Sequence, residues 1–337
     1  MWRTRKRLRA PLSLDERRQG NEQHSTRSCV DTRQFAIGQD EAVSDEDEPR
    51  PAVDVVVPFA GSAEELDEVA QRFGGMSLRE DDTLTIVDNR PPRAPETHAA
   101  HAIRASERQS SYFARNRGAD RGAAPWLLFL DADVEPPADL ADRYFAEQPD
   151  RRTAVLGGGV VDEPLGPGGR IPAAARFVEL RASMSQANTM LDGPWAYAQT
   201  ANCAVRREAF EAVGGFRDNL RSGGDADLCF RLRDAGWAIE ARETAAVHHR
   251  SRRTLRKLLR QRARHGAGAA WLDRHYPGAF PPKRRLGLAK WTAESWGSGI
   301  AAAVRGRRDD ALVAWIEPLW VWAFELGRMF GNEVGDR

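Results

Sequence analysis

The segment LLFLDADVEPP, Leu127–Pro137, decides the fold of this chain. In it, a run of apolar residues leads directly into two carboxylates spaced one residue apart, Asp131 and Asp133, and the chain then turns at paired prolines. A short apolar run bounded by turn residues is typical of a buried β-strand. Alternation along the chain places both carboxylates on the same side, just past the end of that strand.

The residues before this segment carry further strand and helix patterns. A β-branched run, Val53–Val57, is closed by Pro58 and predicts a buried parallel strand. Residues 62–75 predict a helix, because Ser62 stands at the N-cap and Glu65 at the matching position of a capping box. The folded part of the chain therefore begins at this strand.

The order of the elements indicates an α/β fold. Residues 83–89, TLTIVDN, predict a second strand ending at Asp88, and residues 105–122 predict a helix that leads into WLLFL, Trp126–Leu130. Strand, helix, strand, helix, strand in this order predicts a mostly parallel sheet flanked by helices. Ligands of such sheets bind beyond the carboxyl ends of the strands. Three residues occupy that position: Pro58, Asp88 and Asp131.

We expect three parts along the chain. Residues 1–50 are polar and charged without periodicity, so they bury too little apolar surface to offset the entropy of ordering and predict a disordered leader. Residues 51–250 carry the α/β domain. Residues 251–337 predict a helical region, which starts with a basic, leucine-striped helix and ends in an apolar, Trp-rich stretch interrupted by Glu317 and Pro318.

Composition excludes several classes of protein. The 50 Lys and Arg residues nearly balance the 49 Asp and Glu residues, so the whole chain is not a polycation and no nucleic-acid partner is expected. Three cysteines, Cys29, Cys203 and Cys229, have neither paired nor metal-like spacing, which fits a reducing cytoplasm. We find no apolar segment of a secretory signal, and no run of the roughly 18 uncharged apolar residues that a spanning helix needs.

Two carboxylates beyond a buried strand are suited to a hard divalent cation. Mn²⁺ and Mg²⁺ prefer oxygen ligands and commonly bridge a protein carboxylate to the phosphate groups of a substrate. A solvated turn is the alternative, because D-x-D followed by prolines also occurs in loops without a ligand. The spacing alone leaves both interpretations open.

Five blocks of the sequence together resemble the family 2 glycosyltransferases. In that family an A-R-N-x-G helix precedes a hydrophobic strand ending in D-x-D, as in ARNRGADRGAAPWLLFLDADV. The other blocks are VDVVVPFAG, TIVDN, QTANCAVRREAFEAVGGF and SGGDADLCFRL, in the family's order over roughly residues 51–265. The resemblance implies a GT-A fold and an inverting enzyme that uses Mn²⁺ or Mg²⁺ to transfer a single sugar from a nucleoside diphosphate sugar to an acceptor hydroxyl.

The resemblance also implies roles on the donor side. Asp133 would be the first metal ligand, and Asp131 would contact the donor's ribose or sugar and, through water, the metal. A metal at this point stabilises the charge of the departing diphosphate. Asp88 would accept a hydrogen bond from an N–H of the nucleotide base, while Pro58 and Phe59 would wall the nucleotide.

On the acceptor side, Asp225 matches the position of the family's catalytic base. Such a carboxylate takes the proton of the attacking hydroxyl. The family usually has an acidic residue immediately before it, where this chain has Gly224. Asp227 is the second candidate for the base, and capping of the following helix is the alternative role of both carboxylates.

Three further positions have two interpretations each. Arg115 either binds the phosphates through its planar fork or forms an ion pair on a helix surface. Asn202 either contacts the acceptor or transferred sugar, or stabilises a loop. His248 and His249 stand where the family often has a histidine, and we prefer His249 as a metal ligand over a purely solvated loop.

Two other functions are compatible with a sheet of this kind. A nucleotidyl or phosphosugar transferase would need a Gly-rich, basic loop after the first strand, and PFAGSAEE has no basic residue. A non-catalytic nucleotide-sugar-binding module is the other alternative. The sequence does not identify the acceptor, which is a glycan, a lipid-linked glycan or a small molecule. The Trp-rich end fits three arrangements: peripheral contact with the inner face of the plasma membrane, packing on the catalytic domain, or a homodimer contact.

Overall fold

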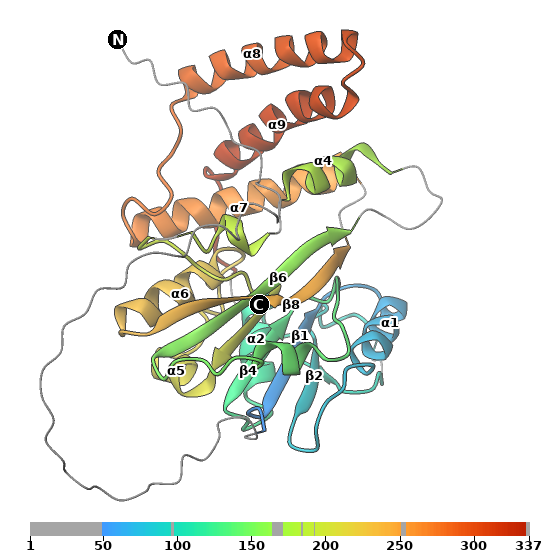
Figure 1. Cartoon of the computed structure of the whole chain (residues 1–337), viewed down its shortest axis with the longest axis vertical. Helices are drawn as coiled ribbons and strands as arrows, with labels where there is room; N and C mark the ends of the chain where they lie inside the picture. The colour runs from blue at the N-terminus through green and yellow to red at the C-terminus, as the bar shows by residue number, and fades with distance from the viewer. Residues whose placement is uncertain are drawn as a thin grey trace, which may run out of the picture. The chain divides into compact units, whose positions relative to one another are not determined.

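The structure of the protein is a computed structural model that describes residues 49–95, 98–163, 171–182, 185–191, 193–250 and 254–334 (Figure 1). Most of the predicted leader, residues 1–48, and with it Cys29, lies outside these residues. The chain from Pro49 onward forms one folded unit.

One eight-stranded sheet runs through this unit in the order β3-β2-β1-β4-β7-β6-β8-β5. The strands are β1 Val53–Phe59, β2 Thr83–Asp88, β3 Ala102–Arg104, β4 Trp126–Leu130, β5 Val134–Glu135, β6 Thr153–Glu163, β7 Asn202–Arg206 and β8 Ala238–Arg250. Parallel pairs join β1 to β2 and β4, β2 to β3, and β6 to β8, whereas β7 and β5 pair antiparallel with their neighbours. The predicted α/β fold with a mostly parallel sheet is confirmed.

Helices cover both faces of the sheet. They are α1 Ala63–Phe73, α2 Ser111–Ala119, α3 Leu140–Tyr144, α4 Ala173–Arg181, the 3₁₀ turn η1 Gln186–Asn188, α5 Arg207–Ala212, α6 Gly224–Asp234, α7 Leu255–His275, α8 Arg285–Val304 and α9 Arg308–Gly327. The predicted capping box of α1 is confirmed. The Ser62 hydroxyl accepts from the Glu65 N–H at 3.3 Å, and the Glu65 carboxylate accepts from the Ser62 N–H at 2.7 Å.

Alternating side chains of the central strands build two apolar layers, one on each face of the sheet. Val56, Leu127 and Phe129 pack in the layer that includes α2, α5 and α6. Val55 and Leu128 pack in the layer that includes α1 and α3. A strand buried on both faces has apolar residues at every position, which explains why WLLFL shows no alternation.

The chain ends in three long helices that pack on one another (Figure 1). Helix α9 contacts α7 on one side and α8 on the other. Where α7 and α9 cross, their backbones approach closely, because a Cβ on Gly266 would overlap the Phe324 carbonyl oxygen. A Cβ on Gly327 would likewise overlap the Ala263 carbonyl oxygen. Among the helices of the described residues, none is long and apolar enough to cross a membrane.

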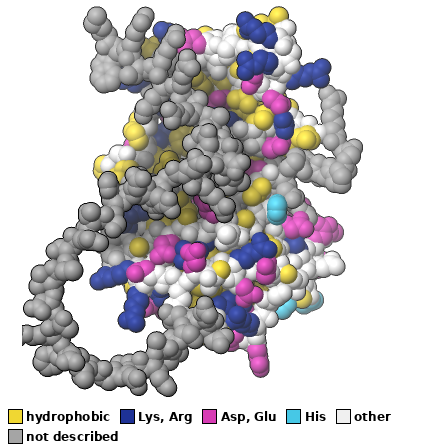
Figure 2. Space-filling view, viewed as in Figure 1, with side chains coloured by type: hydrophobic (Ala, Val, Ile, Leu, Met, Phe, Trp, Pro, Cys, Tyr) yellow, Lys and Arg dark blue, Asp and Glu magenta, His cyan; other side chains and the backbone are white. Residues whose placement is uncertain are grey.

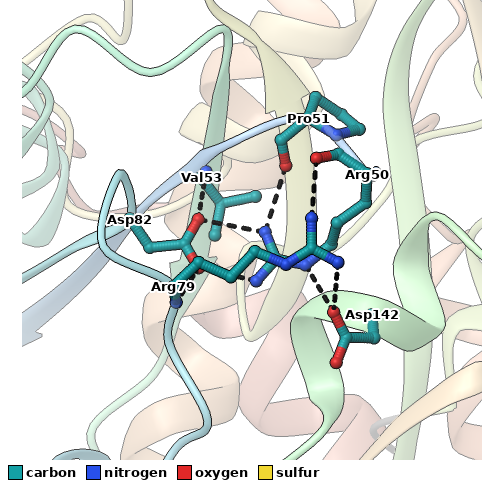
Figure 3. A network of polar contacts seen from close by, with 6 residues as sticks. All are labelled: Arg50, Pro51, Val53, Arg79, Asp82 and Asp142. Carbon is teal, nitrogen blue, oxygen red and sulfur yellow. Dashed lines mark hydrogen bonds and ion pairs between the residues drawn. The ribbon is translucent and has the colours of Figure 1, made fainter. Parts of the chain in front are cut away.

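A buried ion-pair network joins the amino ends of β1 and β2 (Figure 3). The Arg50 guanidinium donates to both carboxylate oxygens of Asp82, at 3.0 and 2.6 Å, and its Nε donates to Asp142 at 2.6 Å. Only 3% of the Arg50 side chain is exposed. The folded unit therefore already includes Arg50, the last residue of the predicted leader.

Candidate active site

The D-x-D motif lies in a turn between β4 and β5. Strand β4 ends at Leu130, and the Val134 N–H donates to the Asp131 carbonyl oxygen at 3.2 Å, which closes the turn. Strand β5 then pairs antiparallel with β8, so that Val134 faces His249. This register brings Asp133 to the imidazole: Asp133 Oδ2 and His249 Nε2 are 3.6 Å apart.

A second carboxylate orients the buried ring of His249. The pairing of β6 with β8 places Asp162 opposite His249, and its Oδ1 lies 2.9 Å from the ring Nδ1. Burial lowers the pKa of His249, but hydrogen bonds with Asp133 and Asp162 outweigh it and raise this pKa to about 9. A histidine that binds a metal typically gives its other ring N–H to a carboxylate. His249 has these surroundings, whereas its neighbour His248 is exposed.

These side chains fit a divalent cation with two protein ligands. Asp133 offers a carboxylate that is 37% exposed, and His249 offers Nε2 on the side away from Asp162. In the described part of the chain, no three His, Cys, Asp or Glu side chains converge on one point. Sites for Mg²⁺ and Mn²⁺ with one or two protein ligands are completed by substrate phosphates and water. Asp133 and His249 are therefore the two side chains that would hold such an ion.

Arg115 forms an ion pair, as one of its two interpretations expects, but the pair is buried. Arg115 is buried and not on a helix surface, and its guanidinium forms an ion pair with Asp131 instead of lying open to a phosphate. Burial raises the pKa of Asp131, and so does Asp133, against the opposing charge of Arg115. Arg115 thus fixes the first carboxylate of the turn, which leaves Asp133 as the carboxylate of the motif best placed for a metal.

Asp225 lies in the first turn of α6 as a half-buried carboxylate. Its Oδ1 accepts from the Ala226 N–H at 3.0 Å and lies 3.5 Å from the Tyr112 hydroxyl. Burial raises the pKa of Asp225, and the charge of Asp131 raises it further. A carboxylate with a raised pKa is a stronger base. The departure at Gly224 also has a physical reason, because a Cβ there would lie 2.8 Å from the Tyr112 ring.

Asp227 has a structural role that is incompatible with that of a base. Its side chain is fully buried and accepts from the Tyr276 hydroxyl at 2.8 Å, and it forms ion pairs with Arg217 at 3.1 Å and Arg231 at 2.9 Å. A carboxylate enclosed in this way cannot reach an acceptor. Helix capping is also wrong for Asp227, because the N-cap residue of α6 is Gly223, without a side-chain cap.

Asp88 lies at the carboxyl end of β2, but its carboxylate is already occupied. Arg90 donates to it through its backbone N, Nε and Nη2 at 3.1, 2.8 and 2.8 Å, and Arg104 donates through Nη1 at 2.6 Å. Burial raises the pKa of Asp88, but these hydrogen bonds outweigh it and lower the pKa overall. The contact expected with a nucleotide base therefore requires an arginine to move. Pro58, at the end of the neighbouring β1, is half-buried.

Phe59 and Asn202 belong to the core. Phe59 packs in the layer that includes α1, so its ring does not wall a ligand site. Asn202 is fully buried: its Oδ1 accepts from the Tyr144 hydroxyl at 2.7 Å, and its Nδ2 donates to the carbonyl oxygens of Gly159 and Ala245 at 2.9 and 2.7 Å. The contact with sugar or acceptor proposed for Asn202 is therefore replaced by a structural role.

Comparison with known proteins identifies the family. A model described as glycosyl transferase family group 2 matches residues 126–327, which is more than half of the chain. The chain belongs to this glycosyltransferase family. The pre-mycofactocin glycosyltransferase of Mycobacterium tuberculosis is 28% identical over 238 residues, or 63% of this chain and 50% of the relative. This glycosyltransferase thus spans about half the length of its mycobacterial relatives.

One further protein and one solved structure are similar to this chain. Glycosyltransferase AglE of Haloferax volcanii is 29% identical over 259 residues, or 74% of this chain and 73% of the relative. Among solved structures, the mannosyltransferase PcManGT from Pyrobaculum calidifontis, in complex with GDP-Man and Mn²⁺, superposes with a TM-score of 0.55 at 16% identity. That match covers 84% of this chain and 88% of PcManGT. The GT-A fold predicted for this glycosyltransferase is confirmed.

The site of the glycosyltransferase includes residues that its sequence did not reveal. Asp162 stands near the end of a strand, as Asp88 does, and that position was its only signal. Tyr112 carries no sequence signal at all, because its contact with Asp225 joins residues 113 positions apart. Helix α7 packs against the segment that precedes α6, because a Cβ on Gly268 would lie 2.8 Å from the Ser222 carbonyl oxygen, so the basic helix lies beside the element that carries Asp225.

Proposed function

We propose that this glycosyltransferase transfers one sugar from a nucleoside diphosphate sugar to an acceptor hydroxyl, with inversion at the anomeric carbon and with Mn²⁺ or Mg²⁺ as cofactor. One arrangement carries the proposal. Asp131 pairs with Arg115, whose guanidinium lies 5.6 Å from the centre of the Tyr112 ring, and the Tyr112 hydroxyl lies 3.5 Å from Asp225 Oδ1. The candidate base and the D-x-D turn are therefore linked through two side chains of α2. A base for the acceptor and a cation for the diphosphate are the two groups that such a transfer needs most.

Each residue of the site then has a defined task. Asp133 and His249 would hold the cation, and a bound cation would supply positive charge to the departing diphosphate. Asp162 holds a proton on Nδ1 of His249, so Nε2 would be the nitrogen that binds the cation, after it loses its own proton. Arg115 fixes Asp131, whose other oxygen faces the donor.

Asp225 performs the proton transfer. Its carboxylate removes the proton of the acceptor hydroxyl as the hydroxyl oxygen forms a bond to the anomeric carbon. The bond from that carbon to the diphosphate oxygen breaks, and the electron pair leaves with the nucleoside diphosphate. Attack opposite the leaving group inverts the configuration at the anomeric carbon.

Two alternatives have less support. For nucleotidyl or phosphosugar transfer, the segment between β1 and α1, residues 60–62, offers no basic side chain for a triphosphate. A non-catalytic nucleotide-sugar-binding module would have no use for a carboxylate with a raised pKa at the position of Asp225. The Mn²⁺ and GDP-Man bound to PcManGT support a nucleotide-sugar donor and a divalent metal.

Melting temperatures and product formation test the proposal with UDP-, GDP- and dTDP-sugars in Mn²⁺, Mg²⁺ or EDTA. A ligand that binds only the native state raises the melting temperature, so we expect one nucleotide class to respond, and only with metal. Asp133→Ala should abolish the response to metal. Metal-stimulated turnover that survives Asp133→Ala would contradict the proposed site, and binding without turnover would favour the binding module.

A further inference from the structure

Large apolar side chains are exposed on the hairpin formed by α8 and α9. We call this surface the hairpin face, and it comprises Leu286, Trp296, Ile300 and Val304 from α8 with Trp315 and Leu319 from α9. Leu286, Ile300 and Val304 are 89%, 62% and 85% exposed. Single exposed apolar residues are ordinary, but a contiguous group of them marks an interaction surface.

The residues of α8 in this group form one stripe. Together with two alanines the stripe runs Leu286, Ala289, Ala293, Trp296, Ile300 and Val304. Successive members are three or four residues apart, so they share one face of the helix. All six are exposed, whereas Leu288, Thr292 and Gly299 on the adjacent face are buried. Because Thr292 and Gly299 contact Trp322 and Trp315, the buried face of α8 packs on α9, and the stripe lies beside that face.

Helix α9 extends the hairpin face on the same side. The Trp296 indole N–H donates to the Trp315 carbonyl oxygen at 3.3 Å, so the two tryptophans meet along the line where α8 and α9 pack together. At the other end of the hairpin, the Arg285 guanidinium lies 3.9 Å from the Met329 sulfur, and Met329 is exposed as well. The apolar surface therefore crosses from one helix to the other.

Basic side chains frame the hairpin face at both ends of α8 (Figure 2). They are Lys283, Arg284 and Arg285 at its start and Arg305, Arg307 and Arg308 after its end, where Asp310 pairs with Arg307 at 2.6 Å and leaves Arg305 and Arg308 as the basic residues of that end. Between Arg285 and Arg305 the helix carries only Lys290 and Glu294 as charged residues, and these two neutralise each other at 3.9 Å. A second copy of the chain docked along α8, parallel or antiparallel, would bring basic ends together. An anionic surface instead gains an attraction at each end.

The hairpin is attached firmly to the catalytic part of the molecule. Besides the close backbone crossing at Gly266, the Arg262 guanidinium of α7 lies over the rings of Trp320 and Phe324, 3.6 and 4.3 Å from their centres. Helix α7 also packs against Ser222, two residues before the helix that carries Asp225, because a Cβ on Gly268 would lie 2.8 Å from the Ser222 carbonyl oxygen. Whatever the hairpin face binds is therefore held in a defined orientation to the active site.

We propose that the hairpin face docks on the surface of a membrane that contains anionic lipids, with α8 in the plane of the headgroups. The aliphatic stripe enters the boundary of the acyl chains, and the basic ends contact lipid phosphates. Trp296 and Trp315 are amphipathic and suit the headgroup level. Docking of this kind needs no helix that spans the bilayer.

Co-sedimentation of the full chain with two kinds of vesicle tests this proposal. We expect binding to vesicles of phosphatidylcholine mixed with phosphatidylglycerol, weaker binding to phosphatidylcholine alone, and a loss of binding at high salt. Ile300→Glu should weaken partitioning at least about tenfold, because it removes a buried aliphatic group and adds an anion. Ser298→Glu adds the same charge on the exposed polar side of α8, two residues away, and should bind as the wild type does.

Three results would overturn membrane docking. The first is equal binding to the anionic and the neutral vesicles. The second is binding by Ile300→Glu that equals that of the wild type. The third is a dimer of the wild type in sedimentation equilibrium that Ile300→Glu dissociates. The last result would assign the hairpin face to a second copy of the chain. Donor hydrolysis without vesicles, measured on the same proteins, should be unchanged by both substitutions. Failure to dock is thereby separated from failure of the proposed sugar transfer.

Discussion

Asp162 Oδ1 lies 2.9 Å from His249 Nδ1 across two paired strands, β6 and β8. The other ring nitrogen of His249 faces Asp133 at 3.6 Å. The D-x-D turn is therefore supported by His249 on β8, and His249 is in turn held by Asp162 on β6. The register of β5 and β6 on β8 assembles this group, and no local motif does so.

Asp162→Asn should weaken metal binding and leave the fold intact. An amide no longer holds the Nδ1 proton as a carboxylate does, so the metal concentration for half-maximal activity should rise about 10- to 100-fold. Titration of activity with Mn²⁺ measures this change. His248→Asn, on the exposed neighbour, serves as the control and should leave the titration curve in place. Equal curves for the wild type and Asp162→Asn would show that Asp162 does not act on the metal site.

Asp225→Asn should abolish sugar transfer while donor binding persists. Loss of a general base typically costs about 10²- to 10⁴-fold in rate. Because Asp225 is placed on the acceptor side, the rise in melting temperature caused by donor and metal should remain. Single-turnover product formation and melting curves measure the two effects. Transfer within threefold of the wild-type rate would rule out Asp225 as the base.

Asp227→Asn should lower the free energy of unfolding and leave catalysis nearly unchanged. The carboxylate of Asp227 is fully buried and paired with Arg217 and Arg231. Removing one partner of a buried pair leaves uncompensated charge and costs about 3 kcal/mol. Urea denaturation should therefore show a lower free energy of unfolding, and transfer per folded molecule should stay close to the wild-type rate. A stability equal to that of the wild type would contradict the structural role.

The pH dependence of transfer should report the surroundings of Asp225. Burial and the charge of Asp131 raise its pKa. The base works only when ionised, so kcat/KM should fall as the pH drops through a value above the ordinary aspartate pKa of about 3.9. Rate profiles at saturating metal measure this acidic limb. If kcat/KM instead fell only at or below the ordinary aspartate pKa, the Asp225 carboxylate would be solvated.

Local patterns made much of the fold predictable, but they could not separate residues by burial. The run Val53–Val57, the capping box at Ser62 and the D-x-D turn are all specified by neighbouring residues. Asp225 and Asp227 look alike in the sequence. They are two positions apart on a helix, about 200° around its axis, so one faces the site and the other the core.

The remaining differences depend on contacts distant in sequence. Arg104 reaches Asp88 only because β3 adds to the edge of β2, and Asn202 is enclosed because Tyr144 and β6 close over it. Phe59 was assigned to a ligand wall by analogy with the family, yet the core layer containing α1 takes up its ring. In each case the residue type fits two environments, and only the packed sheet decides between them.

The pair of Arg50 and Asp82 gives the protein an acid-sensitive contribution to stability (Figure 3). Burial raises the pKa of Asp82, but hydrogen bonds from Arg50 and from the backbone N–H groups of Arg79 and Val53 outweigh it and lower the pKa overall. A carboxyl group with a depressed pKa in the folded state stabilises that state above its unfolded pKa. This contribution is lost as the pH falls through the folded pKa.

Asp82→Asn should therefore lower the free energy of unfolding by about 3 kcal/mol near neutral pH, because Arg50 loses its buried partner. The difference from the wild type should persist down to about pH 4 and shrink below it, where Asp82 of the wild type becomes protonated. Urea denaturation at a series of pH values measures both trends. Asp142→Asn is the matched control: its carboxylate also binds Arg50 but is half exposed, so its loss should cost less than about 1 kcal/mol. If the two substitutions cost the same, or if the Asp82→Asn deficit does not change below pH 4, the buried pair does not stabilise the fold in the way its geometry indicates.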